Sequence, residues 1–191
     1  MQSASADKPT AALSRDVRLD GLPTASRLRV GPASSEELPS LANLLKDCIP
    51  DLKASFSSFK IVHEHTGGIF SINKEQSLVG CFAFLFLNPL GVEKLLDGSL
   101  SMTEPQVAGL ACMGDRVEAI YIWALAVRPP INGIRVMSSF VPWLQRPEFA
   151  HAEIYGRPTT DKGLGFARNL GLRPVSGRAK DRSLWATARF A

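Results

Sequence analysis

The sequence is poor in cysteine and has no long hydrophobic run. Its three cysteines, Cys48, Cys81 and Cys112, are an odd number, and their spacings match no metal-binding or redox motif. We therefore expect reduced, buried thiols and no disulfide framework. The longest apolar run, Leu78–Leu87, covers about half of the roughly 20 residues that a membrane-spanning helix requires, and an Asn-Pro pair stops it. A buried strand is the better interpretation of this run.

Targeting and nucleotide-binding motifs are also lacking. The first residues, MQSASADKPT, contain no basic region and no apolar region, so we expect no secretory signal, no membrane partner and a cytoplasmic location. No P-loop, dinucleotide fingerprint or nucleophile elbow occurs. Basic residues gather toward the C-terminus of this chain of net charge +4, without a nucleic-acid motif. They predict a solvated basic surface, with an acidic or phosphorylated ligand as the alternative, and no nucleic-acid partner.

The sequence contains enough apolar residues to form one hydrophobic core. Its 191 residues are 45% hydrophobic and 21% charged, which is typical of a soluble globular protein. Residues 1–26 are rich in small and polar residues without steady periodicity, so we predict a loose N-terminal arm. A single domain is expected at 27–191.

Hydrophobic patterning predicts a mixed sheet covered by helices. A strand at 28–30 is followed by a helix that Ser34 or Ser35 caps and that Pro50 ends. The segment 51–66 is a weak helix or an ordered loop, and two strands then form a hairpin around 74–77, the second being central. Later elements are strands at 117–127, 149–157 and 183–190 and helices at 134–144 and 161–170. This order indicates an α/β or α+β domain.

Residues 88–116 interrupt the strands with glycines, prolines and one short helical pattern. An insertion of this size beside a site is often a lid or a substrate wall, because connecting segments often carry function. Structural padding is the alternative, and both interpretations stay open.

His63 and His65 flank Glu64 and could suggest a metal pair. No third ligand follows at a recognisable spacing, so we interpret them as surface or capping histidines and expect no metal. Trp123 and Trp143 are expected to pack in the core or at an interface.

Three stretches carry a resemblance to a known family: LVGCFAF, YIWALAVRPPINGIRV and TTDKGLGFARNLGLRPV. In this order they are similar to the third strand, the fourth strand with the cofactor loop, and the closing helix of the GNAT N-acetyltransferase superfamily, whose members transfer an acyl group from acyl-CoA to an amine. The resemblance spans 27–191 and implies one domain with a mixed, mostly antiparallel sheet flanked by helices. It further implies acetyl-CoA or another acyl-CoA as a substrate, no metal, and a small-molecule or peptide amine as acceptor, while a homodimer stays open.

The resemblance places the coenzyme on the fourth strand and the loop after it. Main-chain groups there are implied to contact the acyl carbonyl and pantetheine, over Leu125, Ala126 and Val127. The family's loop has the form Arg/Gln-x-x-Gly-x-Gly/Ala, whose N–H groups hold the pyrophosphate at a helix N-terminus. Here Gly133 takes the middle position, Ile134 begins the helix and Arg135 stands where a small residue belongs. Either Arg128 or Arg135 adds a guanidinium to the phosphates, or two prolines remove donors and Arg135 fills the cradle.

The catalytic positions depart from the family. Tyr121 replaces a strand carboxylate, and Glu118, three residues earlier, reaches the same face only if a bulge intervenes. Ala167 replaces the tyrosine that protonates the leaving thiolate, so Tyr155 is the only nearby phenol. Tyr121, Glu118 and Tyr155 are the candidate catalytic residues, with sheet packing as the alternative for both tyrosines. An N-acyltransferase and a catalytically inactive binding or regulatory module both stay open.

Overall fold

A seven-stranded sheet runs through the molecule in the order β1-β2-β3-β4-β5-β7-β6. The computed structural model describes residues 28–49, 52, 54–128, 144, 146, 149–175 and 183–187. The strands are β1 (Leu28–Pro32), β2 (Ile69–Lys74), β3 (Ser77–Leu87), β4 (Ala119–Val127), β5 (Glu153–Gly156), β6 (Leu172–Pro174) and β7 (Trp185–Thr187). β4 and β5 are parallel and the other neighbours antiparallel, so the sheet is mixed and mostly antiparallel, as the resemblance implies.

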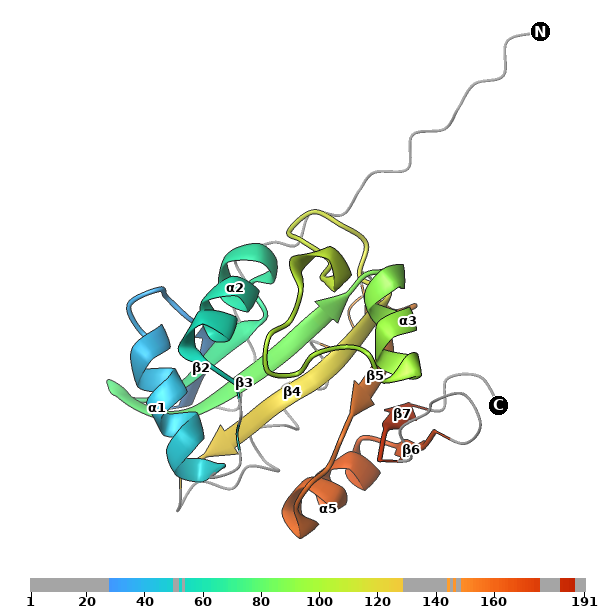
Figure 1. Ribbon diagram of the computed structural model, residues 1–191. Helices are drawn as coiled ribbons and strands as arrows, with labels where there is room; N and C mark the ends of the chain where they lie inside the picture. Colours follow the sequence, from blue (N-terminus) through green and yellow to red (C-terminus); the bar gives the residue numbers. More distant parts are fainter. Residues whose placement is uncertain are drawn as a thin grey trace, which may run out of the picture.

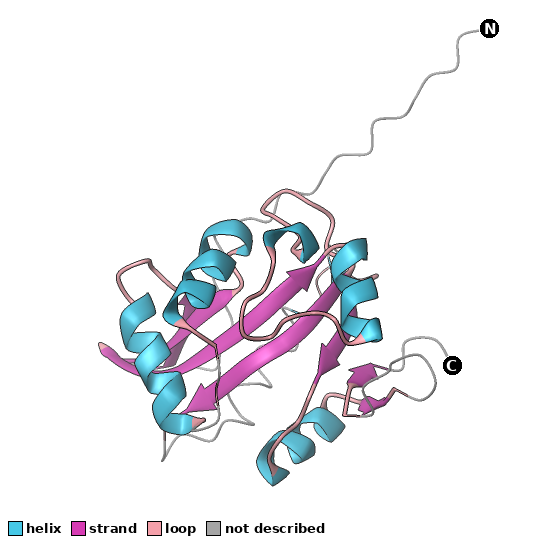
Figure 2. Ribbon diagram, in the orientation of Figure 1, coloured by secondary structure: helices cyan, strands magenta, loops and turns pink. Residues whose placement is uncertain are grey.

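Helices lie against the sheet, which gives the predicted α/β architecture (Figure 2). They are α1 (Leu38–Cys48), α2 (Phe56–Thr66), α3 (Pro89–Asp97), the 3-10 turn η1 (Val107–Gly109) and α5 (Asp161–Asn169). Figure 1 shows α1, α2 and α3 over one face of the sheet. The arm predicted at 1–26 lies outside the described residues, as does the helix predicted at 134–144, apart from Leu144.

The apolar run predicted as a central strand is β3. It pairs with β2 on one side and β4 on the other, and its side chains from Gly80 to Leu87 are buried. Alternate side chains enter two different apolar clusters, one beneath α1 and α2 and one on the opposite face. The second cluster is rich in stacked rings, and Phe86 and Phe149 have centroids 5.7 Å apart. A strand buried on both faces needs an apolar residue at every position, which explains the uninterrupted run.

Local capping explains where the first helices begin and end. Ser34 N–H donates to a Glu37 carboxylate oxygen at 2.8 Å, and Glu37 N–H donates back to the Ser34 hydroxyl at 3.3 Å. The ambiguous segment is helical: Ser55 accepts from Ser58 N–H at the start of α2, and Gly67 ends it at φ 65. Gly67 is therefore the C-cap of α2.

The insertion has its own structure, with α3 and η1 packed together. A Cβ on Gly91 would lie 2.0 Å from the Gly109 carbonyl oxygen, so only glycine permits this approach. The Asn88 side chain accepts from Gly91 N–H at 3.0 Å and donates to the Ala108 carbonyl at 2.8 Å. One residue thus caps α3 and fastens it to η1.

Two expectations were incomplete. The chain has two short strands after α5, β6 and β7, where the residue pattern predicted one. The three cysteines are free thiols, but only Cys81 is buried, and Cys48 is exposed, so the expectation of buried thiols is wrong there. In the part of the chain that the structure describes, no helix has the length and apolar character needed to cross a membrane.

Candidate functional site

The parallel strands β4 and β5 separate halfway along β4. Their pairing runs from Ala119 opposite Glu153 to Ile122 opposite Gly156, where β5 ends. β4 continues to Val127 and stays paired with β3 along that length. The two strands diverge in Figure 1. Beyond Ile122, the described residues of β5 therefore leave the outer edge of β4 without a strand partner.

A bulge at Trp123 coincides with this separation. Ile122 pairs with Phe84 and Ala124 with Ala83, so Trp123 is an extra residue on β4. A bulge bends its strand and increases the local twist, which turns the end of β4 away from the direction of β5. The extra residue also shifts the alternation of side chains between the two faces of the sheet. The Trp123 ring stacks on the Phe59 ring of α2, with ring centroids 4.8 Å apart. This confirms the core packing expected of Trp123.

The main-chain groups of Leu125 and Val127 face the open edge. Arg128 N–H donates to the Val79 carbonyl at 2.8 Å, so the peptide groups of Arg128 point toward β3. Successive residues of a strand direct these groups to opposite edges. The peptide groups of Val127 and Leu125 therefore point away from β3, opposite to those of Arg128. They point to the side from which β5 has withdrawn, and they form a row of donors and acceptors there.

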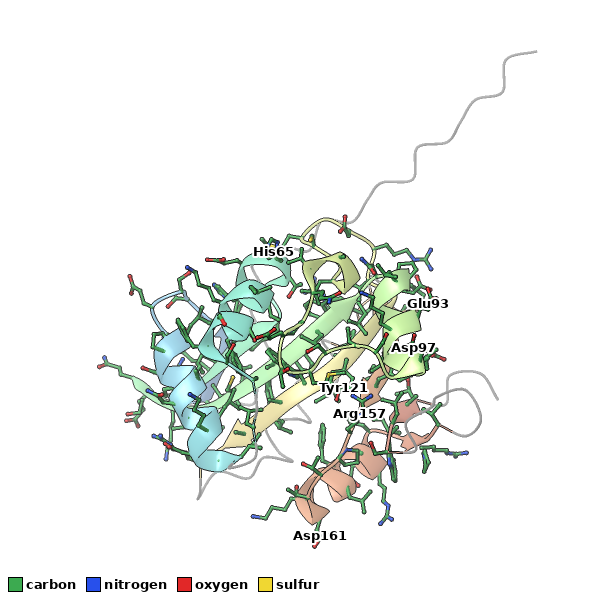
Figure 3. The ribbon with its side chains drawn as sticks, viewed as in Figure 1. His65, Glu93, Asp97, Tyr121, Arg157 and Asp161 are labelled. Carbon is green, nitrogen blue, oxygen red and sulfur yellow. The ribbon has the colours of Figure 1, made fainter. Side chains whose placement is uncertain are left out.

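Two tyrosines lie side by side where the pairing ends. Tyr121 of β4 is the register partner of Tyr155 of β5, and each is 4% exposed. The Tyr155 hydroxyl donates to a carboxylate oxygen of Glu153. The Tyr121 hydroxyl accepts from Nη1 of Arg157 at 3.4 Å, and the Arg157 Cζ atom lies 5.6 Å from the Tyr121 ring centroid. Figure 3 shows Arg157 beside Tyr121. A carboxylate and a guanidinium, both half-buried, flank the tyrosine pair.

The insertion is attached to this region through its main chain. The Trp123 indole N–H donates to the Met102 carbonyl at 2.9 Å, and the Ser58 hydroxyl of α2 donates to the Thr103 carbonyl. These bonds hold residues 102 and 103 over the bulge of β4. A substrate wall and structural padding both remain open interpretations of the insertion.

The structure separates the other candidate catalytic residue from the tyrosines. Glu118 precedes β4 and pairs with Arg116 at 3.5 Å. The bulge lies at Trp123, beyond Tyr121, so it does not bring Glu118 to the face of Tyr121. Tyr121 and Tyr155 are adjacent, while a catalytic role for Glu118 stays a prediction.

The predicted coenzyme loop lies only partly within the described residues. Leu125, Ala126 and Val127 lie in β4 as expected. Gly133, Ile134 and Arg135 lie outside the described residues. Arg128 donates through its guanidinium to Asp47 at 3.2 Å, and both side chains are more than half exposed, so a phosphate would compete with a solvated ion pair.

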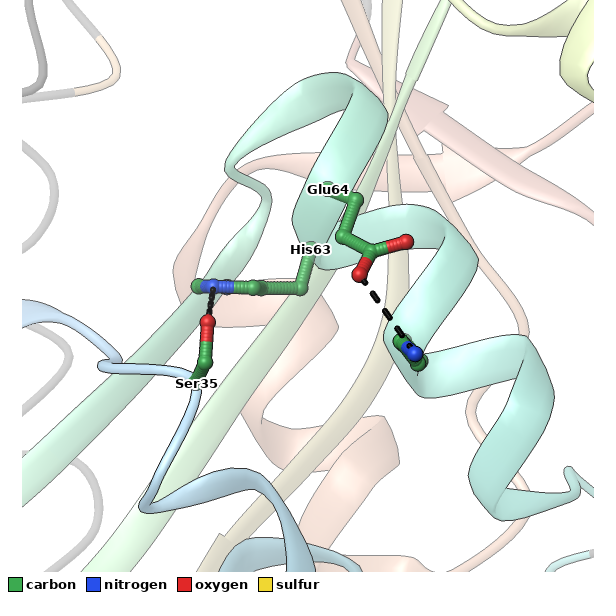
Figure 4. Close-up of polar contacts among 4 residues, drawn as sticks. Ser35, His63 and Glu64 are labelled. Carbon is green, nitrogen blue, oxygen red and sulfur yellow. Dashed lines mark hydrogen bonds and ion pairs between the residues drawn. The ribbon is translucent and has the colours of Figure 1, made fainter.

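In the HEH stretch, His63 and Glu64 make local contacts (Figure 4). His63 Nε2 and the Ser35 hydroxyl are 3.4 Å apart, and Glu64 pairs with Lys60 at 3.7 Å. Among the described residues, no group of three or more His, Cys, Asp or Glu side chains is placed to hold a metal ion.

Arg157 and Glu153 were missed in the sequence, although a signal was present. Glu153, Tyr155 and Arg157 are alternate residues, and the side chains of alternate residues in a strand share one face. Residues 149–157 were predicted only as one more strand, because Tyr121, the register partner of Tyr155, is distant in sequence.

The sheet order, the parallel pair β4–β5 and its separation define the GNAT acetyltransferase fold. Among solved structures of this fold, the loading GNATL domain of CurA from Lyngbya majuscula is 15% identical with a TM-score of 0.61, over 84% of this chain and 96% of that one. GphF, a GNAT-like decarboxylase in complex with isobutyryl-CoA, is 16% identical with a TM-score of 0.56, over 84% and 98%. Arabidopsis thaliana Naa50 in complex with the bisubstrate analogue CoA-Ac-MVNAL is 12% identical with a TM-score of 0.51, over 84% and 96%. No family model matches the chain, and no curated protein matches its sequence.

Proposed function

We propose that the chain is an acyl-CoA-dependent N-acyltransferase, most simply an acetyltransferase, that acts on a small-molecule or peptide amine. One observation carries the proposal: β4 parts from β5 after Ile122 and directs the peptide groups of Leu125 and Val127 into the opening. N–H donors fixed in advance are suited to stabilise the oxyanion of a tetrahedral intermediate. The CoA complexes of GphF and Naa50 support an acyl-CoA as the ligand of this fold.

Acyl transfer needs an oriented carbonyl and two proton transfers. The amine nitrogen attacks the thioester carbon, the carbon–sulfur bond breaks, the nitrogen loses a proton and the thiolate gains one. Glu153, with Tyr155 donating to it, accepts the amine's proton. Tyr121, held by Arg157, supplies the proton to the thiolate. Glu118 remains the predicted alternative as proton acceptor.

The fold by itself does not choose the reaction, since one similar structure is a decarboxylase and another is bound to a peptide bisubstrate analogue. Glu153 favours transfer to an amine. Its carboxylate accepts from the Tyr155 hydroxyl, and such a group attracts an ammonium group and then accepts its proton, whereas decarboxylation requires no such acceptor.

A non-catalytic binding module is the second candidate. Ala167, buried in α5, stands where the resembling family has its thiolate-protonating tyrosine. Such a module would bind CoA through the same main-chain groups and would not turn it over.

Two measurements distinguish a transferase from a binding module: thermal unfolding with acetyl-CoA, and then thiol release with a panel of amines. A ligand at 100 times its dissociation constant adds about 2.7 kcal/mol to the free energy of unfolding, which raises the melting temperature by several degrees. Stabilisation with amine-dependent thiol release supports the transferase. Stabilisation without release supports the binding module, and no stabilisation by acetyl-CoA or CoA overturns both.

A further inference from the structure

The insertion is fastened over the bulge of β4 by side chains of two other elements. The Trp123 indole N–H of β4 donates to the Met102 carbonyl at 2.9 Å. The hydroxyl of Ser58, a buried residue of α2, donates to the Thr103 carbonyl. Figure 2 shows the segment between α3 and η1 on the face of the sheet that α1 and α2 cover. The main chain at residues 102 and 103 is therefore held against both α2 and β4.

The insertion is also bonded within itself. Leu100 N–H donates to the Lys94 carbonyl at 2.9 Å, and Lys94 Nζ donates to the Gln106 side chain at 2.7 Å. These bonds tie the segment 98–106 to α3 at its middle and at its end. Segments that open readily have few buried contacts and few internal bonds, so this segment has the properties of a fixed wall and not those of a mobile lid.

The segment packs on the same face of the sheet as the tyrosine pair. Leu100 is 7% exposed and belongs to the apolar cluster that also contains Tyr121 and Tyr155. The half-buried side chains of Met102 and Trp123 pack against this cluster. The face of the sheet that carries the two tyrosines is therefore the face on which the insertion lies.

The direction from which an acceptor must approach follows from the orientation of the thioester carbonyl. Hydrogen bonds from a strand edge lie close to the plane of the sheet, and a carbonyl oxygen accepts near the plane of its own substituents. A thioester carbonyl that accepts from the Leu125 or Val127 N–H is thus nearly coplanar with the sheet. A nucleophile attacks a carbonyl carbon from above or below this plane, so the amine arrives from one face of the sheet. Tyr121, the proposed proton donor, assigns the acceptor to the face of the insertion.

We propose that the segment 98–106 is the wall of the acceptor site, and that Met102 selects amines whose nitrogen is on an unbranched carbon. The acceptor is then a primary alkylamine of the form R–CH2–NH2 and not an α-amino group that carries a side chain. A fixed wall in a closely packed site leaves no room for a branch beside the reacting nitrogen. Trp123 is a positioning residue, because its indole N–H fixes the Met102 main chain. The proposal rests on the proposed transferase function for the direction of approach.

The test uses conjugates in which the CoA sulfur is joined through an acetyl group to the amine nitrogen, so that binding is measured without turnover. The n-butyl, sec-butyl and tert-butyl conjugates are isomers that differ in branching at the carbon next to this nitrogen. Titration calorimetry with the full chain should show an affinity about 10–100-fold lower for the tert-butyl than for the n-butyl conjugate, as expected when extra groups are forced into a packed site. Equal affinities for the three isomers overturn the proposal.

Variants test which residues impose this limit. Met102→Ala should raise the affinity for the tert-butyl conjugate and remove most of the difference between the isomers. Trp123→Phe keeps an aromatic ring beside Phe59 but lacks the N–H donor, so it should remove part of the difference. Val107→Ala changes an apolar residue of the same insertion that is 38% exposed, and this matched control should keep the difference. Thermal unfolding reports whether each variant is folded. Full retention of the difference by a folded Met102→Ala, or by Trp123→Phe where Met102→Ala does not fold, overturns the assignment.

Thiol release from acetyl-CoA separates failure of this proposal from failure of the transferase. The three butylamines are added to the panel of amines as acceptors. Graded binding of the conjugates without release by any amine contradicts only the transferase. Binding of CoA and of the conjugates without a gradient contradicts only the wall. Failure of CoA and of all three conjugates to bind overturns both.

Discussion

Tyr121 and Tyr155 are register partners across the only parallel pair of strands among the described residues, and their hydroxyls contact groups of opposite charge. In strands that are paired throughout, such tyrosines would be sheet packing and no more. Here the pairing ends one residue further on, and no described residue pairs with β4 on that side beyond Ile122. This is the relationship from which the first two predictions follow.

Leu125→Pro should lower the affinity for acetyl-CoA by about tenfold, because it removes one N–H that faces the opening. The matched variant is Ala126→Pro, one residue along β4, whose N–H faces β3 and whose loss breaks the ladder at a cost of about 1–3 kcal/mol. Titration calorimetry and urea unfolding of both variants give the comparison. Equal loss of stability in the two would contradict the assigned peptide directions.

Glu153→Gln should reduce kcat by about 10²–10⁴-fold at neutral pH, because the amine's proton loses its acceptor. Glu118→Gln is the informative comparison, since Glu118 pairs with Arg116 away from the tyrosines. We expect the smaller effect there. Single-turnover rates for both variants decide between the two carboxylates, and a larger loss in Glu118→Gln would reverse their roles.

Gly91→Ala should destabilise the chain by about 1–3 kcal/mol, because the new Cβ collides with the Gly109 main chain. Gly165→Ala in α5 is the matched control. Nothing lies within 4 Å of a Cβ at that position, so the higher helix propensity of alanine should leave stability unchanged or raise it by up to about 1 kcal/mol. Chemical denaturation measures both changes. Equal stability of the two variants would show that α3 and η1 do not pack closely.

The Cys81 thiol should make the free energy of unfolding decrease as the pH rises into the alkaline range. Burial, and secondarily the charge of Glu37, raise its pKa well above the ordinary value of 9.0. Above about pH 9 the unfolded chain loses this proton while the folded chain keeps it, so the unfolded state binds fewer protons and the free energy of unfolding decreases, by at most about 1.4 kcal/mol per pH unit. Below that pH the contribution is fully present.

Urea unfolding between pH 8 and pH 10 measures this slope. The slope should be shallower in Cys81→Ala than in the parent chain, because the other titrating groups are common to both. Cys48→Ala, at an exposed position, should keep the parent slope. Identical slopes in the parent chain and Cys81→Ala would contradict the raised pKa.

The sequence alone predicted those elements that their own local residue pattern is enough to define. The run Leu78–Leu87 specifies a doubly buried strand by itself. The cap predicted at Ser34 or Ser35 lies too early, because the N-cap of α1 is Glu37 and no side chain caps it. β6 was missed because a strand of three residues shows no periodicity. α2 stayed ambiguous because its stability comes from tertiary contacts such as Phe59 on Trp123, which a local pattern does not contain.

The site was less accessible to sequence reasoning than the fold. The bulge at Trp123 is defined by which residues of β3 it faces, and no property of β4 alone specifies that register. Tyr121 and Tyr155 were named as separate candidates because their adjacency depends on a parallel pairing between distant segments. Arg157 gains its significance only from that pairing.

β5 is hydrogen-bonded to β4 over Glu153–Gly156 alone, and β7 and β6 follow it in the sheet. A ladder this short joins the outer strands to β4 at one end only. A slight rotation of the outer strands about it would scarcely move Tyr121, yet would widen the far end near Val127 in proportion to the distance from the ladder. The reacting end of a bound thioester would then keep one geometry, while the opening between the strands at the phosphate end could change in width to fit the ligand.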